Sequence, residues 1–356
     1  MNAPDDRTRL TSAEPGDEAQ PSAAPGTTPD AWAEANQRLL AAELAWLAAM
    51  LREPSGDLAR AADGVAAAAI QVASERVDAA RREMPARSAL DEAAERFGLS
   101  PFERSVLLLA AAPELDTGLA RTVAQPSLGL ALARLPGAHW SAVTPTAPLR
   151  AWRLVTLDGG VSAPIMAARL GVDEAVLHRL TGLAGAAAEN GFDGGGLDGW
   201  LAPWLQAQPP RALMDAAQRD TAEHLARQLR EANPPRAVTM LHGDDGPGRQ
   251  DVAAWLAARL GRRLFRLQAA DLPADPAALL ALAERWRREA RWLDLALLVE
   301  LPAPGSDGPA AGPVAVAAAE SGAGEASGAL ATRVERFVAA LEGLVVIAAP
   351  EPVAAL

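Results

Sequence analysis

Apolar positions in the first part of the chain recur every three or four residues, the spacing of amphipathic helices. Asp30 can cap a helix that runs to about Arg52, and four leucines share one face of it: Leu40, Leu44, Leu47 and Leu51. A second, alanine-rich helix fits residues 56–83. The two could form an antiparallel hairpin or associate with another subunit, and packing within the chain is the simpler interpretation. Residues 1–29, rich in acidic residues, Pro, Ser, Thr and Ala, predict a disordered tail.

The clearest helix start lies at Ser100. This serine can act as N-cap, Pro101 occupies the first helical position, and Glu103 completes a capping box. The helix before it ends at Gly98, with Leu90, Ala94 and Phe97 on one face. The segment after it, residues 106–110, is too apolar for a surface helix.

A short hairpin is predicted after these helices. Residues 128–135 fit another helix, and residues 149–157 alternate as a strand, turn at 158–160 and return through Ile165. Asp173 can cap a last helix through Leu180. Three helices followed by a hairpin predict a winged-helix-like domain over residues 87–190, after a helical hairpin over 30–86.

Short, largely apolar segments replace the helical pattern in the second half. The segments are residues 237–241, 263–267, 295–300 and 344–348. Segments of this length, separated by helical patterns, predict parallel strands in one sheet with helices on both faces. We expect a hinge and linker helix over 191–235, with the glycine-rich hinge at 191–199. An α/β domain over 236–356 follows, with a low-complexity insertion at 302–328.

One loop in this region has the spacing of a phosphate-binding loop. Residues 243–250 read Gly-Asp-Asp-Gly-Pro-Gly-Arg-Gln, between a predicted strand and a predicted helix. Arg249 stands where such loops carry a Lys, and Gln250 stands where they carry the Ser or Thr that ligates Mg²⁺. The candidate nucleotide-binding residues are Gly243, Gly246, Gly248, Arg249 and Gln250. A plain Gly/Pro turn is the alternative, and the two aspartates would repel a phosphate.

Composition and charge narrow the classes of function. All 33 basic residues are Arg, so composition alone could account for Arg249. The chain has no Cys and four His, none of which are four residues apart, so no metal site is expected. A net charge of −12 argues against general affinity for nucleic acid. No signal peptide or membrane-spanning run is evident, and a cytoplasmic protein is expected.

A family resemblance extends this picture. Residues 90–116, with the motifs at 136–140, 149–154 and 173–178, resemble the variant winged-helix region in front of certain bacterial AAA+ ATPases. Residues 236–350 resemble the degenerate first AAA+ module that follows it in that family. The resemblance implies that strand 237–241 lies beside strand 344–348. It also implies that the P-loop domain over 236–356 is incomplete and that further elements would follow Leu356. The chain is therefore expected to be either the N-terminal part of a longer protein, which we favour, or a natural truncation.

The resemblance also implies loss of catalytic groups. Family members end the strand matching 295–301 in Asp-Glu. Here Glu300 is followed by Leu301 and preceded by Val299, so one carboxylate is missing in either register. Glu300 is the only catalytic candidate. Pro350 stands where the family has a polar residue that orients water.

Three hypotheses follow. The first is a non-hydrolysing AAA+-family segment, with weak ATP binding at most and doubtful Mg²⁺ binding. It would act in assembly or regulation of an ATP-dependent remodelling machine, through protein partners or self-association. The second is a competent ATPase that relies on Arg249 and Glu300; the chain alone is not expected to be catalytic. The third is a winged-helix nucleic-acid-binding regulator, in which Arg134, Arg150 and Arg153 line one face, although the surrounding acidity disfavours it.

Overall fold

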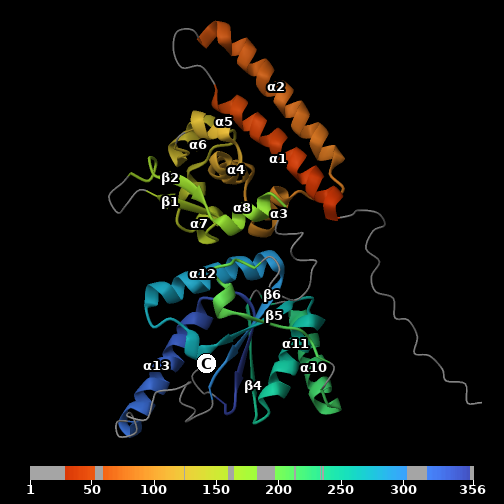
Figure 1. The fold of residues 1–356 in the computed structure, drawn as a ribbon, viewed down its shortest axis with the longest axis vertical. Coiled ribbons are helices and arrows are strands. Elements are labelled where there is room, and N and C mark those ends of the chain that lie inside the picture. The colour runs from red at the N-terminus through yellow and green to blue at the C-terminus, as the bar shows by residue number, and fades with distance from the viewer. Residues whose placement is uncertain are drawn as a thin grey trace, which may run out of the picture.

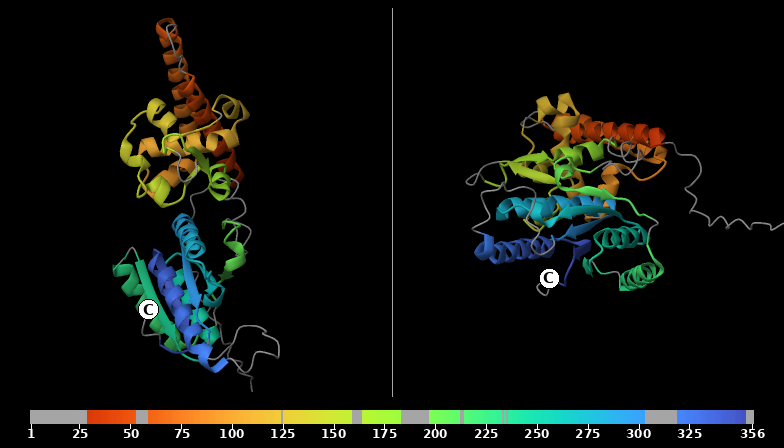
Figure 2. Two further views of the ribbon diagram at one scale, coloured as in Figure 1. Left: turned by 90° about the vertical axis from the view of Figure 1, so that its left-hand side faces the viewer. Right: turned by 60° about the horizontal axis from the view of Figure 1, so that its bottom comes forward.

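The computed structural model describes residues 29–52, 59–123, 125–158, 164–182, 197–211, 214–232, 234, 236–302 and 319–352. It places a helical domain on one side of helix α12 and a sheet with further helices on the other (Figures 1 and 2). Almost all of the predicted tail, residues 191–196 of the predicted hinge and most of the 302–328 insertion lie outside the described residues.

The first four helices are α1 (Pro29–Leu51), α2 (Ala59–Glu83), α3 (Ala89–Phe97) and α4 (Pro101–Leu115). Three of them, α1, α3 and α4, share one hydrophobic core, and α2 packs against α1. Leu40, Leu44 and Leu47 of α1 are buried in the same cluster as Phe97 and Val106. The predicted leucine stripe is therefore covered by packing within the chain.

The start of α4 has the predicted capping geometry. The Ser100 hydroxyl accepts a hydrogen bond from the Glu103 N–H at 3.2 Å, and the Glu103 carboxylate accepts one from the Ser100 N–H at 2.9 Å. Helix α3 ends at Gly98, whose φ of 67° lies in the left-handed region that glycine tolerates. The capping box over residues 100–103 is confirmed.

The rest of the helical domain departs from the sequence prediction at one place. Its elements are α5 (Thr117–Thr122), α6 (Leu128–Arg134), η1 (Trp140–Val143), α7 (Pro148–Ala151), β1 (Val155–Asp158), β2 (Arg169–Val172) and α8 (Glu174–Leu180). The predicted strand at 149–157 is wrong over its first residues, because Pro148 starts the single helical turn α7. Ile165 lies in a turn rather than in the returning strand. Strands β1 and β2 pair antiparallel, and Asp173 caps α8 as predicted.

The second half forms a five-stranded sheet in the order β3-β5-β6-β7-β4. Its elements are η2 (Ala202–Trp204), β3 (Gln206–Gln208), α10 (Ala216–Ala232), β4 (Arg236–His242), α11 (Gly246–Arg259), β5 (Arg263–Gln268), η3 (Ala269–Asp271), α12 (Pro276–Leu293), β6 (Leu295–Glu300), α13 (Ala319–Ala339) and β7 (Gly343–Ala349). The four predicted strands are parallel, and β4 lies beside β7 as expected. The sequence did not predict β3, a short antiparallel edge strand.

Successive residues of each strand point to opposite faces of the sheet, so the side chains of the sheet belong to two separate cores. One face, including Leu298 and Val346, packs on α10 and α11, largely against alanines such as Ala253 and Ala257. The other face, including Leu297 and Val345, packs on α12 and α13. Both faces are covered, which explains why the central strands β6 and β7 are almost entirely apolar.

Helix α12 joins the two halves. Its Trp292 is buried in the core of the helical domain, with its ring centroid 5.1 Å from that of Phe97. Its Trp286 is buried in the core of the sheet. One helix, which lies between the two halves in Figure 1, therefore contributes to both cores.

Candidate functional site

The 243–250 loop lies where β4 ends and α11 begins. Helix α11 starts at Gly246, with Asp245 as its N-cap. The Asp245 carboxylate accepts a hydrogen bond from the Gly248 N–H at 2.9 Å. A Cβ atom at Gly248 would lie 2.1 Å from the same carboxylate, so only glycine allows this approach. An anion from the chain itself thus occupies a backbone donor that a phosphate loop offers to its ligand.

Arg249 is directed back at its own loop. Its guanidinium donates a hydrogen bond to the carbonyl of Gly243. Gly243 has a φ of 139°, and its N–H donates to the carbonyl of Pro350 at 3.2 Å. The loop is therefore tied to itself and to the end of β7.

Gln250 and Glu300 are brought together, although fifty residues separate them. The Gln250 amide donates to one Glu300 oxygen at 2.9 Å. The other Glu300 oxygen accepts from Arg266 at 3.1 Å and from Gln268 at 2.9 Å. Both oxygens of the candidate base already accept hydrogen bonds from side chains.

Arg266 and Gln268 are the site residues that sequence reasoning missed. They lie on β5, which pairs with β6 so that Gln268 is opposite Glu300. No motif marks them. Alternation of polar and apolar residues along β5 could have indicated them. Arg266 and Gln268 are polar, whereas Leu264, Phe265 and Leu267 of the same strand are buried.

The residues directly before and after Glu300 in the sequence, Val299 and Leu301, supply no second carboxylate. Val299 is fully buried in the core on the α12 side of the sheet, and Leu301 packs against the same core. The Leu301 N–H donates to the carbonyl of Ala348 at 2.8 Å. A hollow of about 590 Å³ opens between the loop, Arg266, Glu300 and Pro350. Within the described ranges, no three His, Asp or Glu side chains gather closely enough to hold a metal ion.

A second polar assembly lies at the junction of the two halves. We call it the junction cluster; its members are Asp173, Arg179, Asp198, Arg285, Arg288 and Glu289. Arg288 and Glu289, adjacent on α12, are both fully buried. Glu289 accepts hydrogen bonds from Arg179, from Arg288 at 3.3 Å and from the Asp198 N–H at 3.2 Å. The pairing of buried charges satisfies groups that would otherwise be very costly to bury.

Burial changes the protonation equilibria within this cluster. Desolvation raises the pKa of Glu289 above its ordinary value of 4.5, even though Arg179 and Arg288 act to lower it. Desolvation likewise lowers the pKa of Arg179. For Asp173, burial acts to raise the pKa, but Arg288 and Arg285 outweigh it and the net shift is downward.

The junction cluster includes a residue of the predicted hinge. Asp198, inside the predicted 191–199 stretch, is 6% exposed, and its carboxylate accepts from Arg285 at 3.0 Å and from Arg288 at 2.9 Å. The described end of that stretch is therefore fixed to α12.

Comparison with known families identifies one part of the chain. The family model described as "Winged helix domain, variant" matches residues 7–129. The chain contains a variant winged-helix domain. The match spans α1 to α5 and stops before the β1–β2 hairpin. No curated protein and no solved structure matches the chain.

Two of the three arginines that the sequence could place on one nucleic-acid-binding face, Arg150 and Arg153, have partners within the chain. Arg150 donates to the carbonyl of Val143 at 2.9 Å, and Arg153 pairs with Glu284 of α12 at 2.9 Å. Arg153 also adopts a φ of 49°, and its carbonyl accepts from Arg288 at 3.2 Å. Two of the three thus serve the internal structure of the winged-helix domain or its attachment to α12.

Across the part of the chain that the structure describes, no helix combines the length and the hydropathy needed to span a bilayer.

Proposed function

We propose that this chain is a non-hydrolysing segment of the AAA+ family, in which a winged-helix domain is joined to a degenerate nucleotide-binding fold. Its role is assembly or regulation of an ATP-dependent remodelling machine through protein partners. The observation that carries the proposal is the self-occupied loop: the Asp245 carboxylate holds the Gly248 N–H, and Arg249 holds the Gly243 carbonyl.

Support for the phosphate-loop origin comes from topology. The loop follows β4, the helix after it covers one face of the sheet, and β7 lies directly beside β4. The carboxyl ends of β4, β6 and β7 meet at one edge, which places residues 243–250, Glu300 and Pro350 together. Open parallel sheets bind their ligands at such an edge.

Support for the loss of hydrolysis comes from the same residues. A transferred phosphoryl group needs a metal ion bridging the phosphates, a positioned cation and an oriented water. Gln250 donates its amide to Glu300, so this pair is engaged internally. Pro350 has no side-chain donor or acceptor to orient water. Arg249 and Arg266 beside the hollow leave room for a weak, salt-sensitive attraction to anions, not for an organised Mg²⁺·ATP site.

Repair of the loop is the sharpest test. Calorimetric titration of the full chain with ATP·Mg²⁺ is expected to give weak binding at most, and phosphate release should stay at background. The triple variant Asp245→Gly, Arg249→Lys, Gln250→Thr frees the Gly248 N–H and restores both side chains of a working loop. It should gain about tenfold or more in affinity, which corresponds to ~1.4 kcal/mol of restored contacts.

Arg249→Lys alone is the matched control. It should bind no more tightly than the wild type, because Asp245 still holds the Gly248 N–H. A triple variant that folds like the wild type by circular dichroism and still fails to bind would contradict a phosphate-loop origin. Wild-type turnover that disappears in Glu300→Gln would show a competent ATPase and overturn the proposal.

A further inference from the structure

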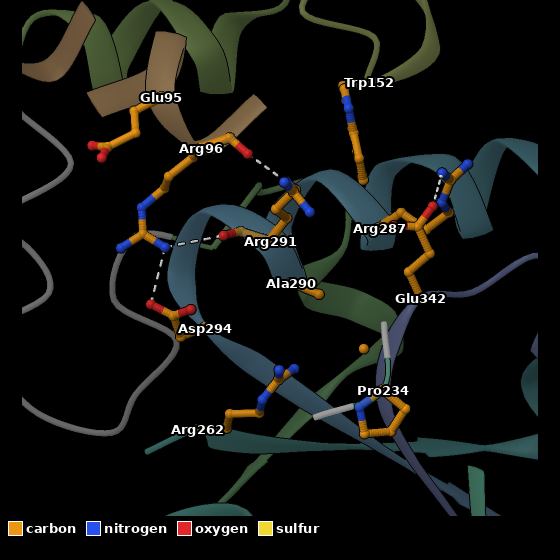
Figure 3. Close-up of a pocket in the computed structure, with 11 residues that line it drawn as sticks. Glu95, Arg96, Trp152, Pro234, Arg262, Arg287, Ala290, Arg291, Asp294 and Glu342 are labelled. Carbon is orange, nitrogen blue, oxygen red and sulfur yellow. Dashed lines mark hydrogen bonds and ion pairs between the residues drawn. The ribbon is translucent and has the colours of Figure 1, made fainter. Parts of the chain in front are cut away.

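A second hollow, of about 520 Å³, lies between the winged-helix domain and the sheet (Figure 3). One side is formed by Arg96 of α3 and by Trp152, just after α7. The other side is formed by Arg262, before β5, and by Gly343, the first residue of β7. These positions lie at the amino ends of the parallel strands. The hollow is therefore at the opposite edge of the sheet from the 243–250 loop and independent of the proposed function.

Four arginines and three acidic residues line this hollow: Arg96, Arg262, Arg287, Arg291, Glu95, Asp294 and Glu342. Each acid already has a partner. Glu95 pairs with Arg87, Asp294 with Arg96 at 3.0 Å and Glu342 with Arg287 at 2.5 Å. All three acidic groups of the lining therefore already form ion pairs with arginines other than Arg262.

The guanidinium of Arg262 has no such partner among the described residues. Arg291, by contrast, donates to the Arg96 carbonyl and stacks 5.0 Å from the Trp152 ring centroid. In Figure 3, Arg262 points into the hollow from the side of the sheet, and no interaction joins it to the other residues drawn. Among the described residues, Arg262 is thus the arginine of this lining whose guanidinium has no hydrogen-bond, ion-pair or ring partner, and Arg291 likewise has no acidic partner.

Gly343 sets the position of this cation. It has a φ of 80°, and a Cβ atom built on it would lie 3.0 Å from a terminal nitrogen of Arg262. A side chain here would push the guanidinium away, and the left-handed φ would strain it as well. Glycine at the start of β7 lets Arg262 lie against the backbone while its charge faces the hollow.

We propose that this hollow is a docking site for an acidic side chain of a protein partner, with Arg262 as its anchor. The planar guanidinium matches a carboxylate in a two-bond arrangement. The four arginines and three acidic residues of the lining carry a net charge of +1, which the single negative charge of a carboxylate balances. A phosphate dianion would carry twice that charge close to Asp294 and Glu342, and their repulsion disfavours it. Because both domains line the hollow, a docked acidic segment contacts both at once.

The test uses the full chain and a fluorescently labelled acetyl-hexaglutamate amide, read by fluorescence anisotropy at low salt. The peptide should bind the wild type and bind Arg262→Gln about tenfold more weakly, the loss expected for one charge-assisted contact. Arg336→Gln, which removes an exposed arginine of α13, is the matched control and should bind like the wild type. Acetyl-hexaglutamine amide should not bind.

Three results would overturn the proposal. One is the absence of hexaglutamate binding to the wild type at low salt. Another is equal binding by the wild type and Arg262→Gln. The third is displacement of the peptide by inorganic phosphate at concentrations below those at which free acetate displaces it, which would assign the hollow to a phosphate group instead.

Discussion

The guanidinium of Arg288 lies 2.9 Å from the carboxylate of Asp198, ninety residues away in the sequence. Their side chains are 0% and 7% exposed. Arg288 also reaches Asp173 at 3.4 Å and the carbonyl of Arg153 at 3.2 Å, both in the half of the chain that precedes the sheet. One side chain of α12 therefore links a loop, a helix cap and a turn that the sequence places far apart.

Arg288→Met should destabilise the protein strongly. Removing the guanidinium leaves Asp198 and Glu289 buried with fewer partners, and breaking a buried ion pair costs about 3–5 kcal/mol. Urea unfolding followed by tryptophan fluorescence measures this loss. Arg336→Met, at an exposed position of α13, should change the free energy of unfolding by less than ~0.5 kcal/mol. Equal effects of the two substitutions would contradict a structural role for the junction cluster.

Glu289 should make stability depend on pH in a direction unusual for a carboxyl group. Burial raises its pKa in the folded state above the ordinary value of 4.5, so the folded protein holds this proton more tightly than the unfolded chain does. Its contribution is therefore greatest at low pH and is lost as pH rises from about 4.5 through the raised value. The difference in unfolding free energy between wild type and Glu289→Gln, measured from pH 4 to pH 8, should follow this trend. A difference independent of pH would show that Glu289 does not titrate in this range.

The capping box of α4 gives a third prediction. Ser100→Ala removes the acceptor of the Glu103 N–H and the partner of His139 at 2.9 Å, so the variant should lose about 1 kcal/mol of stability. Thermal unfolding by circular dichroism measures it. Ser74→Ala, within α2, removes no cap and should be close to neutral. Equal melting temperatures for Ser100→Ala and the wild type would show that the cap is not needed.

Asp245→Ala tests the self-occupied loop through stability rather than nucleotide binding. Loss of the carboxylate leaves the Gly248 N–H without its acceptor at the start of α11, which should cost about 0.5–2 kcal/mol. Asp244→Ala, next to it and exposed, removes no cap and should cost less than ~0.5 kcal/mol. Urea unfolding separates the two, and an Asp245→Ala variant as stable as Asp244→Ala would remove the basis for the loop geometry.

Much of the sheet could be predicted, because strands that are buried on both faces consist mostly of apolar residues and appear in the sequence as short apolar segments. Strands β4, β6 and β7 are such segments, and the family resemblance implied that β4 lies beside β7, as the structure shows. Strand β3 could not be found this way, because it is three residues long, contains Gln206 and Gln208, and lies at an edge. The single turn α7 was missed because a short apolar alternation fits a helical turn followed by a strand equally well.

The candidate site was predictable only in its spacing. The pattern of glycines located residues 243–250, and the strand pattern located Glu300. The contacts of Glu300 with Arg266 and Gln268 depend on the register between β5 and β6, which no local pattern specifies. The junction cluster could not be predicted for the same reason. Arg288 and Glu289 lie in an arginine-rich helix whose sequence is typical of a solvent-exposed helix, and only the tertiary contacts show that they are buried.

Helix α12 has a consequence for how the chain unfolds. Trp292 belongs to the core of the winged-helix domain and Trp286 to the core of the sheet, with the buried charges of Arg288 and Glu289 between them. Loss of either core would free one end of the same helix and expose unpaired charges. The two domains should therefore melt as a single cooperative unit, so that a chain with two hydrophobic cores behaves in calorimetry like a chain with one.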